Sequence, residues 1–221
     1  MKFPITIAPN FFSDTHKILK IANELDYVVD EPFYPGKKTI FLNHIDMGLF
    51  YHLSRKVLNL FFEIDDDIGK LQYNNVEWAF HKIKYDDIKD MRKGELFIHK
   101  DHPEHLTGLI YLSHNENLGT SFYLNEKTPS FHKMNGPICG LDKNISDEEM
   151  ENLYKENNSG FKLMSEVRHI FNTAVIFPGC VPHKINLEDL RPGEERLTLH
   201  FLFREIGYYT FPYVRCKLED L

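Results

Sequence analysis

The sequence predicts a mainly β fold with N-terminal helices, an α+β class in which the strands form a sandwich or a barrel. From about residue 71, short runs rich in β-branched and aromatic residues follow one another, separated by Gly, Pro, Asn and Asp. Most of these runs have no helical segment between them, which argues against a doubly wound sheet. Eighteen Phe and eleven Tyr are also typical of a strand-rich chain.

Two amphipathic helices are expected before the strands begin. Residues 10–25, NFFSDTHKILKIANEL, repeat apolar residues along one helical face and offer Ser13 as the N-cap. Residues 48–64, GLFYHLSRKVLNLFFEI, are apolar around more than half of the helix, so this helix should pack against a large apolar surface. Residues 1–70 are therefore expected to form a helical support region.

The strand-rich core is expected over residues 71–206. Its runs are VEWAFHKIKY, ELFIHKD, HLTGLIYLS, GTSFYL, VRHIFNTAVIFPG, VPHKINL and ERLTLHFLFREI. Residues 126–165 interrupt them with a polar stretch that is expected to be an insertion or lid, in which Ser146 and Glu149 fit the capping box of a short helix. A chain of this length is expected to fold as a single domain over residues 1–221.

Composition and charge exclude several classes of partner. Hydrophobic residues make up 42% and charged residues 27% of the chain, as in ordinary globular proteins. The net charge of −7 gives no general attraction for nucleic acid or for anionic lipid. No run approaches the ~18 apolar residues of a membrane-spanning helix. The three cysteines are scattered and the N-terminus lacks a signal-like apolar run, so a cytoplasmic location is expected.

A candidate metal site begins in the run FIHKD. In a strand, alternate side chains share a face, so His99 and Asp101 can both reach one cation. Alone, a His-x-Asp pair is more often a solvated turn or an ion pair. His183, in the run VPHKINL, supplies a third ligand. Two histidines and one carboxylate on a single face leave open positions, an arrangement that suits non-haem Fe(II) oxygen chemistry.

Other polar residues near these three are expected to have no ligand role. Pro103 ends the strand, which leaves His102 and His105 in a surface turn, with a role at the rim of the site as the less favoured alternative. Cys180 precedes His183 by three residues, but a buried small hydrophobe is favoured over a fourth ligand.

The last strand offers a binding group for a carboxylate. In ERLTLHFLF, Arg196, Thr198 and His200 alternate with apolar residues, so the strand has one polar and one apolar face. An arginine that points into a barrel is costly unless a carboxylate meets it, and its planar fork binds carboxylates bidentately. A dicarboxylate that chelates the metal at one end and is anchored on Arg196 at the other would fill open positions on the metal and would also compensate the charge of the arginine. His200 is open to two interpretations, a cavity-lining residue and a hydrogen-bonded core histidine.

This order of motifs resembles the 2-oxoglutarate- and Fe(II)-dependent oxygenases, specifically their prolyl-hydroxylase-like branch. The motifs are His99-x-Asp101, then LTGLIYLS followed by GTSFY, then VIFPGCVPH with His183, and finally RLTLHFLF with Arg196. The resemblance covers about residues 71–206. It implies a double-stranded β-helix, a cupin-like jelly-roll barrel closed by the N-terminal helices.

The resemblance also implies roles for six residues. The iron ligands would be His99, Asp101 and His183, and Arg196 would bind the distal carboxylate of 2-oxoglutarate, with Thr198 assisting it and Tyr111 hydrogen-bonding the co-substrate. Each of the last two also has a plain structural interpretation, Tyr111 as an aromatic filler of the barrel and Thr198 as an ordinary strand residue.

Two departures from the family pattern stand out. The interval from His183 to Arg196 is thirteen residues, longer than usual, which leaves Arg191 as a rival anchor; Arg196 is preferred because Arg191 lies in a turn-like segment. The usual Gly-Gly pair appears as Leu118-Gly119.

The activity that the resemblance implies is that of an Fe(II)- and 2-oxoglutarate-dependent dioxygenase, most simply a hydroxylase. It would couple oxidation of an unknown small molecule or peptidyl side chain by O2 to decarboxylation of 2-oxoglutarate to succinate and CO2. Two alternatives stay open: a cupin-like metal-binding barrel without oxygenase activity, and a zinc hydrolase on the same ligands. The chain contains no G-x-S-x-G, H-E-x-x-H, Walker A or dinucleotide fingerprint.

Overall fold

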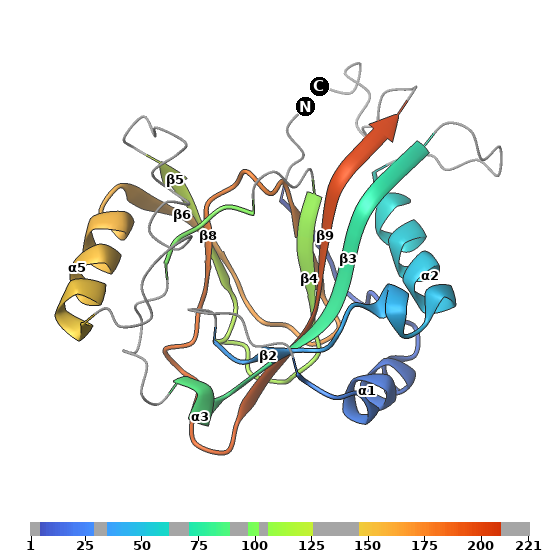
Figure 1. The fold of residues 1–221 in the computed structure, drawn as a ribbon, viewed down its shortest axis with the longest axis horizontal. Helices are drawn as coiled ribbons and strands as arrows, with labels where there is room; N and C mark the ends of the chain where they lie inside the picture. Colours follow the sequence, from blue (N-terminus) through green and yellow to red (C-terminus); the bar gives the residue numbers. More distant parts are fainter. Residues whose placement is uncertain are drawn as a thin grey trace.

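Two antiparallel sheets and a few helices make up the protein (Figure 1). The computed structural model describes residues 5–28, 35–61, 71–88, 97–101, 106–125 and 146–208. The helices are α1 (Thr15–Glu24), α2 (Met47–Leu58), α3 (Tyr85–Ile88) and α5 (Asp147–Asn158), with a 3-10 turn, η1, at Leu42–His44. The strands are β1 (Thr6–Ala8), β2 (Lys37–Lys38), β3 (Leu71–Lys84), β4 (Leu106–Tyr111), β5 (Thr120–Asn125), β6 (Phe161–Val167), β7 (Ala174–Phe177), β8 (His183–Ile185) and β9 (Glu195–Tyr208).

The strands pass back and forth between the two sheets. The large sheet has the order β1-β7-β4-β9-β3-β2 and the small sheet the order β6-β5-β8. An isolated bridge pairs His99 with His183 and so places residues 97–101 beside β8. Along the chain, β4, β7 and β9 of the large sheet therefore alternate with strands of the small one. The predicted mainly β class with N-terminal helices is confirmed.

One face of the large sheet packs on the N-terminal helices. Figure 1 places α1 and α2 on the side of this sheet opposite to the small sheet. Alternate residues of β9 and β3 form the core there with apolar residues of both helices, among them Ile18, Leu53, Val57, Trp78, Phe201 and Phe203. The indole Nε1 of Trp78 donates a hydrogen bond to Ser54 Oγ of α2 (3.0 Å). The expectation that the second helix packs against a large apolar surface is confirmed for Met47–Leu58.

The helix caps show how local chemistry sets the helix starts. Asp14, and not the expected Ser13, caps α1, because its carboxylate accepts hydrogen bonds from the backbone N–H groups of His16 and Lys17. The capping box of Ser146 and Glu149 is present at the start of α5 as predicted. Residues 126–145 lie outside the described residues. No helix in the described part of the chain has the length and hydropathy needed to cross a membrane.

The other face of the large sheet turns toward the small sheet. A second apolar cluster joins the two sheets through Leu109, Tyr111, Val175 and Phe177 of the large sheet and Phe122 and Val167 of the small one. Arg196 and Thr198 are buried on this face, the inner face of the large sheet, because Leu197 and Leu199, which alternate with them, point to the helices. The polar and apolar faces predicted for this strand are confirmed.

Gly119 is required where the chain enters β5. A Cβ at this position would lie 2.0 Å from the Val167 carbonyl oxygen and 3.0 Å from its carbon, both backbone atoms that cannot move easily. We expect Gly119→Ala to lower the free energy of unfolding by about 1–3 kcal/mol, as overpacking does. Chemical denaturation measures this change. Gly48→Ala on the exposed side of α2 is the control and should be neutral or stabilising; equal stability of both variants would contradict the prediction.

Candidate metal centre

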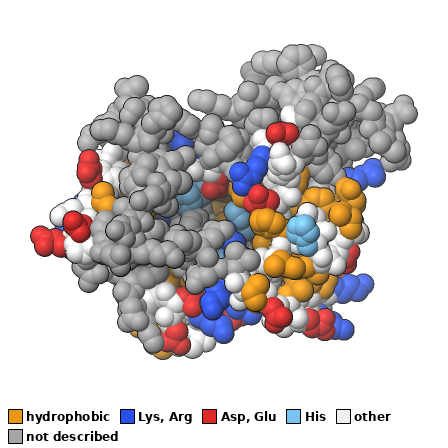
Figure 2. Space-filling model, in the orientation of Figure 1, with side chains coloured by type: hydrophobic (Ala, Val, Ile, Leu, Met, Phe, Trp, Pro, Cys, Tyr) orange, Lys and Arg blue, Asp and Glu red, His pale blue; other side chains and the backbone are white. Residues whose placement is uncertain are grey.

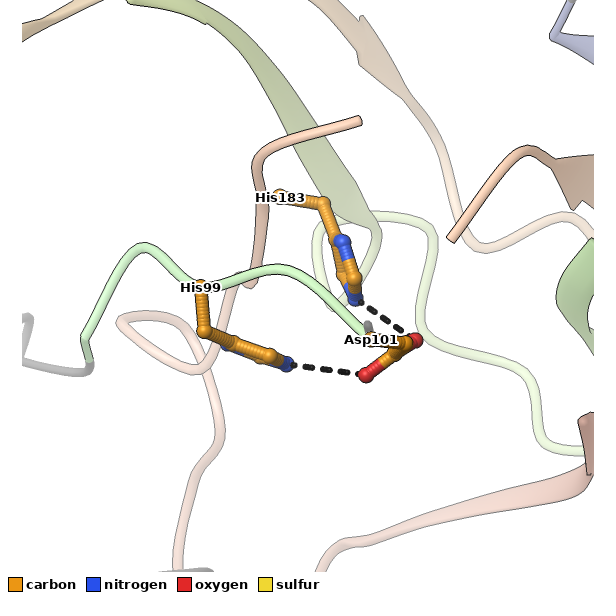
Figure 3. Close-up of side chains that lie close together, drawn as sticks. All are labelled: His99, Asp101 and His183. Atoms are coloured by element: carbon orange, nitrogen blue, oxygen red, sulfur yellow. Dashed lines mark ion pairs between the residues drawn. The ribbon is translucent and has the colours of Figure 1, made fainter. Parts of the chain in front are cut away.

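His99, Asp101 and His183 come together between the sheets (Figure 3). The carboxylate lies between the two imidazoles: His99 Nε2 is 3.7 Å from Asp101 Oδ1, and His183 Nε2 is 3.4 Å from Asp101 Oδ2. The nearest ligand atoms of the three residues all lie within 4.8 Å of one another. Two imidazole nitrogens and a carboxylate oxygen so placed are a donor set for a divalent cation.

The backbone holds the two histidines side by side. His99 N donates to His183 O (3.0 Å) and His183 N donates to His99 O (2.9 Å), so the two residues form a hydrogen-bonded antiparallel pair. The predicted strand at 97–101 is limited to this bridge in the described residues. Alternation along it still turns Asp101 to the side of His99, as the sequence predicted.

Backbone carbonyls fix which nitrogen of each ring faces the carboxylate. His99 Nδ1 lies 3.1 Å from Phe97 O, and His183 Nδ1 lies 2.9 Å from Val181 O. A carbonyl oxygen only accepts, so each Nδ1 carries the proton and donates it. The lone pair of each neutral ring is then on Nε2, the atom that faces Asp101. Such outer hydrogen bonds orient histidine ligands in metal sites.

Thr107 supports Asp101 and was not predicted from the sequence. Its hydroxyl lies 3.0 Å from Asp101 Oδ2 and 3.2 Å from Phe201 O, and it is buried on the inner face of β4. Burial raises the pKa of the Asp101 carboxyl, but the electrostatic interactions with the neighbouring histidines and the hydrogen bond from Thr107 outweigh it, so the net pKa is lowered. Burial lowers the pKa of His183 to about 4. An ionised carboxylate and a neutral imidazole are the forms that bind a cation.

Arg196 lies in the interior and its rival Arg191 lies on the surface. The side chain of Arg196 is 1% exposed, and its Nε donates to Leu118 O (2.8 Å). Within the described residues its Nη2 is buried without a hydrogen bond, while other interactions hold the side chain in place. Arg191 is exposed and pairs with Asp189 (3.0 Å). Of the two candidates, only Arg196 has the buried position expected of an interior carboxylate anchor.

Tyr111 and Thr198 lie beside Arg196. Tyr111 and Thr198 are paired across β4 and β9, and both are buried. The guanidinium carbon of Arg196 is 5.7 Å from the centre of the Tyr111 ring. The Tyr111 hydroxyl hydrogen-bonds Thr120 Oγ1 (2.9 Å). Burial raises the pKa of Tyr111 although the charge of Arg196 opposes the shift, so the hydroxyl stays protonated and can donate.

His169 braces this cluster, and nothing in the sequence singled it out. Its Nδ1 donates to Leu118 O (3.2 Å), the carbonyl that also accepts from Arg196. Its Nε2 therefore accepts from the Ser113 hydroxyl (3.0 Å), and its ring stacks on that of Tyr111 with centroids 4.2 Å apart. Burial lowers the pKa of His169 to about 3, so the ring is neutral and adds no charge beside the guanidinium.

Cys180, His102 and His105 are the other residues considered from the sequence. Cys180 is exposed, so the expectation of a buried small hydrophobe was wrong. The turn predicted for His102 and His105 lies outside the described residues.

The metal site is partly accessible to solvent. The side chains of His99 and Asp101 are 14% and 17% exposed, which leaves a cation a path of entry. Figure 2 shows histidine side chains near the middle of one face of the molecule.

Known structures share this fold at low sequence identity. HygX from Streptomyces hygroscopicus, with nickel and 2-oxoglutarate bound, superposes with a TM-score of 0.55 and 17% identity over 94% of this chain and 84% of HygX. The iron-bound form of HygX superposes with a TM-score of 0.52 and 16% identity over 94% of this chain and 83% of HygX. A prolyl hydroxylase from Trichoplax adhaerens, in complex with a hypoxia inducible factor peptide fragment, is less similar, with a TM-score of 0.49 and 13% identity over 90% of this chain and 82% of that protein.

At these identities the structural likeness establishes the fold alone. A search of curated proteins found no significant match. The sequence matches one protein family over residues 2–203, nearly the whole described chain. The chain therefore belongs to DUF6445, a family of unknown function.

Proposed function

We propose that this protein is an Fe(II)- and 2-oxoglutarate-dependent oxygenase, most simply a hydroxylase, built as one double-stranded β-helix domain. The observation that carries the proposal is the combination of the His99, Asp101 and His183 triad with an arginine buried on the inner face of the large sheet. A metal site alone fits many functions. A metal site with an interior carboxylate anchor fits a chelating dicarboxylate.

The three ligands fit a cation with open coordination positions. His99 and His183 would bind it through Nε2, and Asp101 through a carboxylate oxygen, with the backbone and Thr107 holding the ligands in orientation. When bound, iron and its co-substrate supply the oxidising chemistry, in which O2 and 2-oxoglutarate are converted with succinate and CO2 as products. The chain supplies the ligands and their orientation.

Arg196, Tyr111 and Thr198 would bind the co-substrate. The guanidinium fork would meet the distal carboxylate, and the hydroxyls of Tyr111 and Thr198 lie on the same inner face of β4 and β9. HygX, which shares the fold, binds nickel, iron and 2-oxoglutarate, and this supports the choice of ligands. The substrate, the role of residues 126–165 as a lid and a cytoplasmic location stay predictions.

Two alternatives differ from the proposal in measurable ways. A cupin-like binding barrel would use the triad without needing Arg196, and a zinc hydrolase would work without O2. Buried Arg196 favours the oxygenase over both, since a chelating dicarboxylate gives an interior guanidinium a carboxylate to bind.

The test is turnover of 2-oxoglutarate by the purified protein. Succinate should form only when Fe(II), 2-oxoglutarate and O2 are all present, and it should form slowly even without substrate. Replacing iron by zinc should abolish succinate formation while 2-oxoglutarate still stabilises the zinc-loaded protein against heat. A protein that is not stabilised by 2-oxoglutarate with any divalent metal, or that is active with zinc in the absence of O2, would refute the oxygenase.

A further inference from the structure

His200 occupies the middle of the inner face of the large sheet. It pairs with Leu109 of β4 on one side and with Ala79 of β3 on the other. It points to the same side as Arg196 and Thr198, because alternate residues of a strand share a face. Ala79 contributes only a methyl group beside it. The imidazole is therefore a polar group on an inner face that the helices do not reach.

The contacts of His200 differ from those of the other inner histidines. His81 Nε2 donates to Pro35 O (2.8 Å), and both ring nitrogens of His169 are hydrogen-bonded. For His200 the structure records no hydrogen bond, ion pair or ring contact within the described residues. The interpretation as a hydrogen-bonded core histidine therefore finds no support, and the cavity-lining interpretation is favoured.

The register of the strands places His200 beside the metal triad. Leu202, the next inner residue of β9, pairs with Thr107, and Thr107 hydrogen-bonds Asp101. Alternate residues are ~7 Å apart along a strand, so His200 lies one such step from the level of Asp101 and two steps from Arg196. Burial, followed by the charge of Lys38, lowers the pKa of His200 to about 3. An imidazole ring carries at least one N–H donor whether it is neutral or protonated.

We propose that His200 is a positioning residue whose N–H donates a hydrogen bond to the metal-side end of 2-oxoglutarate. This inference rests on the proposed function. The co-substrate has acceptor oxygens only at its two ends, with two CH2 groups between them. Arg196 would take the distal end, so a donor near the level of Asp101 meets the oxygens at the other end. The hydrogen bond would fix the orientation of the co-substrate about the metal.

The test compares side chains with and without a donor. His200→Leu preserves the approximate volume and removes the N–H, whereas His200→Gln keeps an N–H at a similar reach. Binding of 2-oxoglutarate to the zinc-loaded proteins is measured by calorimetry, and zinc affinity is measured separately. We expect His200→Leu to weaken 2-oxoglutarate binding about 10-fold or more, as loss of a hydrogen bond to a charged group does. Zinc affinity should be unchanged, and His200→Gln should restore much of the loss.

A histidine far from the metal triad provides the control. His114→Gln, at an exposed ring that stacks on Phe171, should bind 2-oxoglutarate as the parent does. Equal binding by His200→Leu and the parent, loss of zinc affinity in His200→Leu, or no recovery in His200→Gln would overturn the inference. If His200→Leu does not fold, His200→Ala takes its place in the comparison. Failure of the parent itself to bind 2-oxoglutarate would instead overturn the proposed function.

Discussion

Replacement of Asp101 by alanine is expected to abolish tight metal binding and, with it, all succinate formation. Asp101 is the anionic member of the triad and lies between the two Nε2 atoms. Loss of an outer hydrogen-bonding partner already costs a metal site about 10–100-fold in affinity, so loss of a charged ligand should cost about 100-fold or more. Calorimetric titration of the apo protein with zinc or Mn(II) measures the affinity directly.

Thermal unfolding gives a second measurement of the same effect. A metal at 100 times its dissociation constant stabilises the parent by about 2.7 kcal/mol, whereas Asp101→Ala should gain almost nothing at that concentration. Asp189→Ala is the matched control, because it removes an exposed carboxylate that pairs with Arg191 at the surface. A zinc affinity in Asp101→Ala equal to that of the control would mean that the cation binds elsewhere.

The triad could be predicted because its geometry follows from local rules. His99 and Asp101 are two residues apart in an extended segment, and that spacing alone turns them to one side. The two faces of β9 were predictable for the same reason, since Leu197 and Leu199 join the helix-packed core while Arg196 and Thr198 face inward. His183 needed the order of motifs as well, because its bridge with His99 joins segments that are far apart in the chain.

The supporting residues could not be predicted because they depend on tertiary contacts. Thr107 is an ordinary strand threonine until the fold brings its hydroxyl to Asp101. His169 supports Arg196 through a carbonyl, that of Leu118, which carries no signal in the sequence. Cys180 was expected to be buried from its residue type, but the turn before β8 exposes it. Residue type and spacing predicted which groups come together in the triad, and packing determined which groups hold them.

Arg196 poses the opposite energetic problem from Asp101, because it is a cation buried in the interior. Burying a guanidinium is costly unless a partner of opposite charge compensates it. The carbonyl of Leu118 accepts one hydrogen bond but carries no formal charge. A dicarboxylate anion bound between the metal and the guanidinium would stabilise both charges at once. We therefore expect the guanidinium of Arg196 to bind the distal carboxylate of the co-substrate.

The consequence is that Arg196→Met should lose 2-oxoglutarate while keeping its metal. Truncating one partner of a buried charge pair costs about 2–5 kcal/mol, so the affinity of the zinc-loaded protein for 2-oxoglutarate should fall by about 30-fold to several thousand-fold. Zinc affinity should match the parent, because the triad is intact. The apo variant should be somewhat less stable than the parent, because the replacement removes the hydrogen bond from Arg196 Nε to Leu118 O. Calorimetry and thermal unfolding measure these three quantities on the same samples.

Arg191→Met is the control that decides between the two arginines. Arg191 is exposed and pairs with Asp189, so its replacement should leave the affinity for 2-oxoglutarate within experimental error of the parent. The reverse pattern, with 2-oxoglutarate lost in Arg191→Met and retained in Arg196→Met, would transfer the anchor to the surface residue. Retention in both variants would remove the case for an arginine anchor and would favour the cupin-like binding protein over the oxygenase.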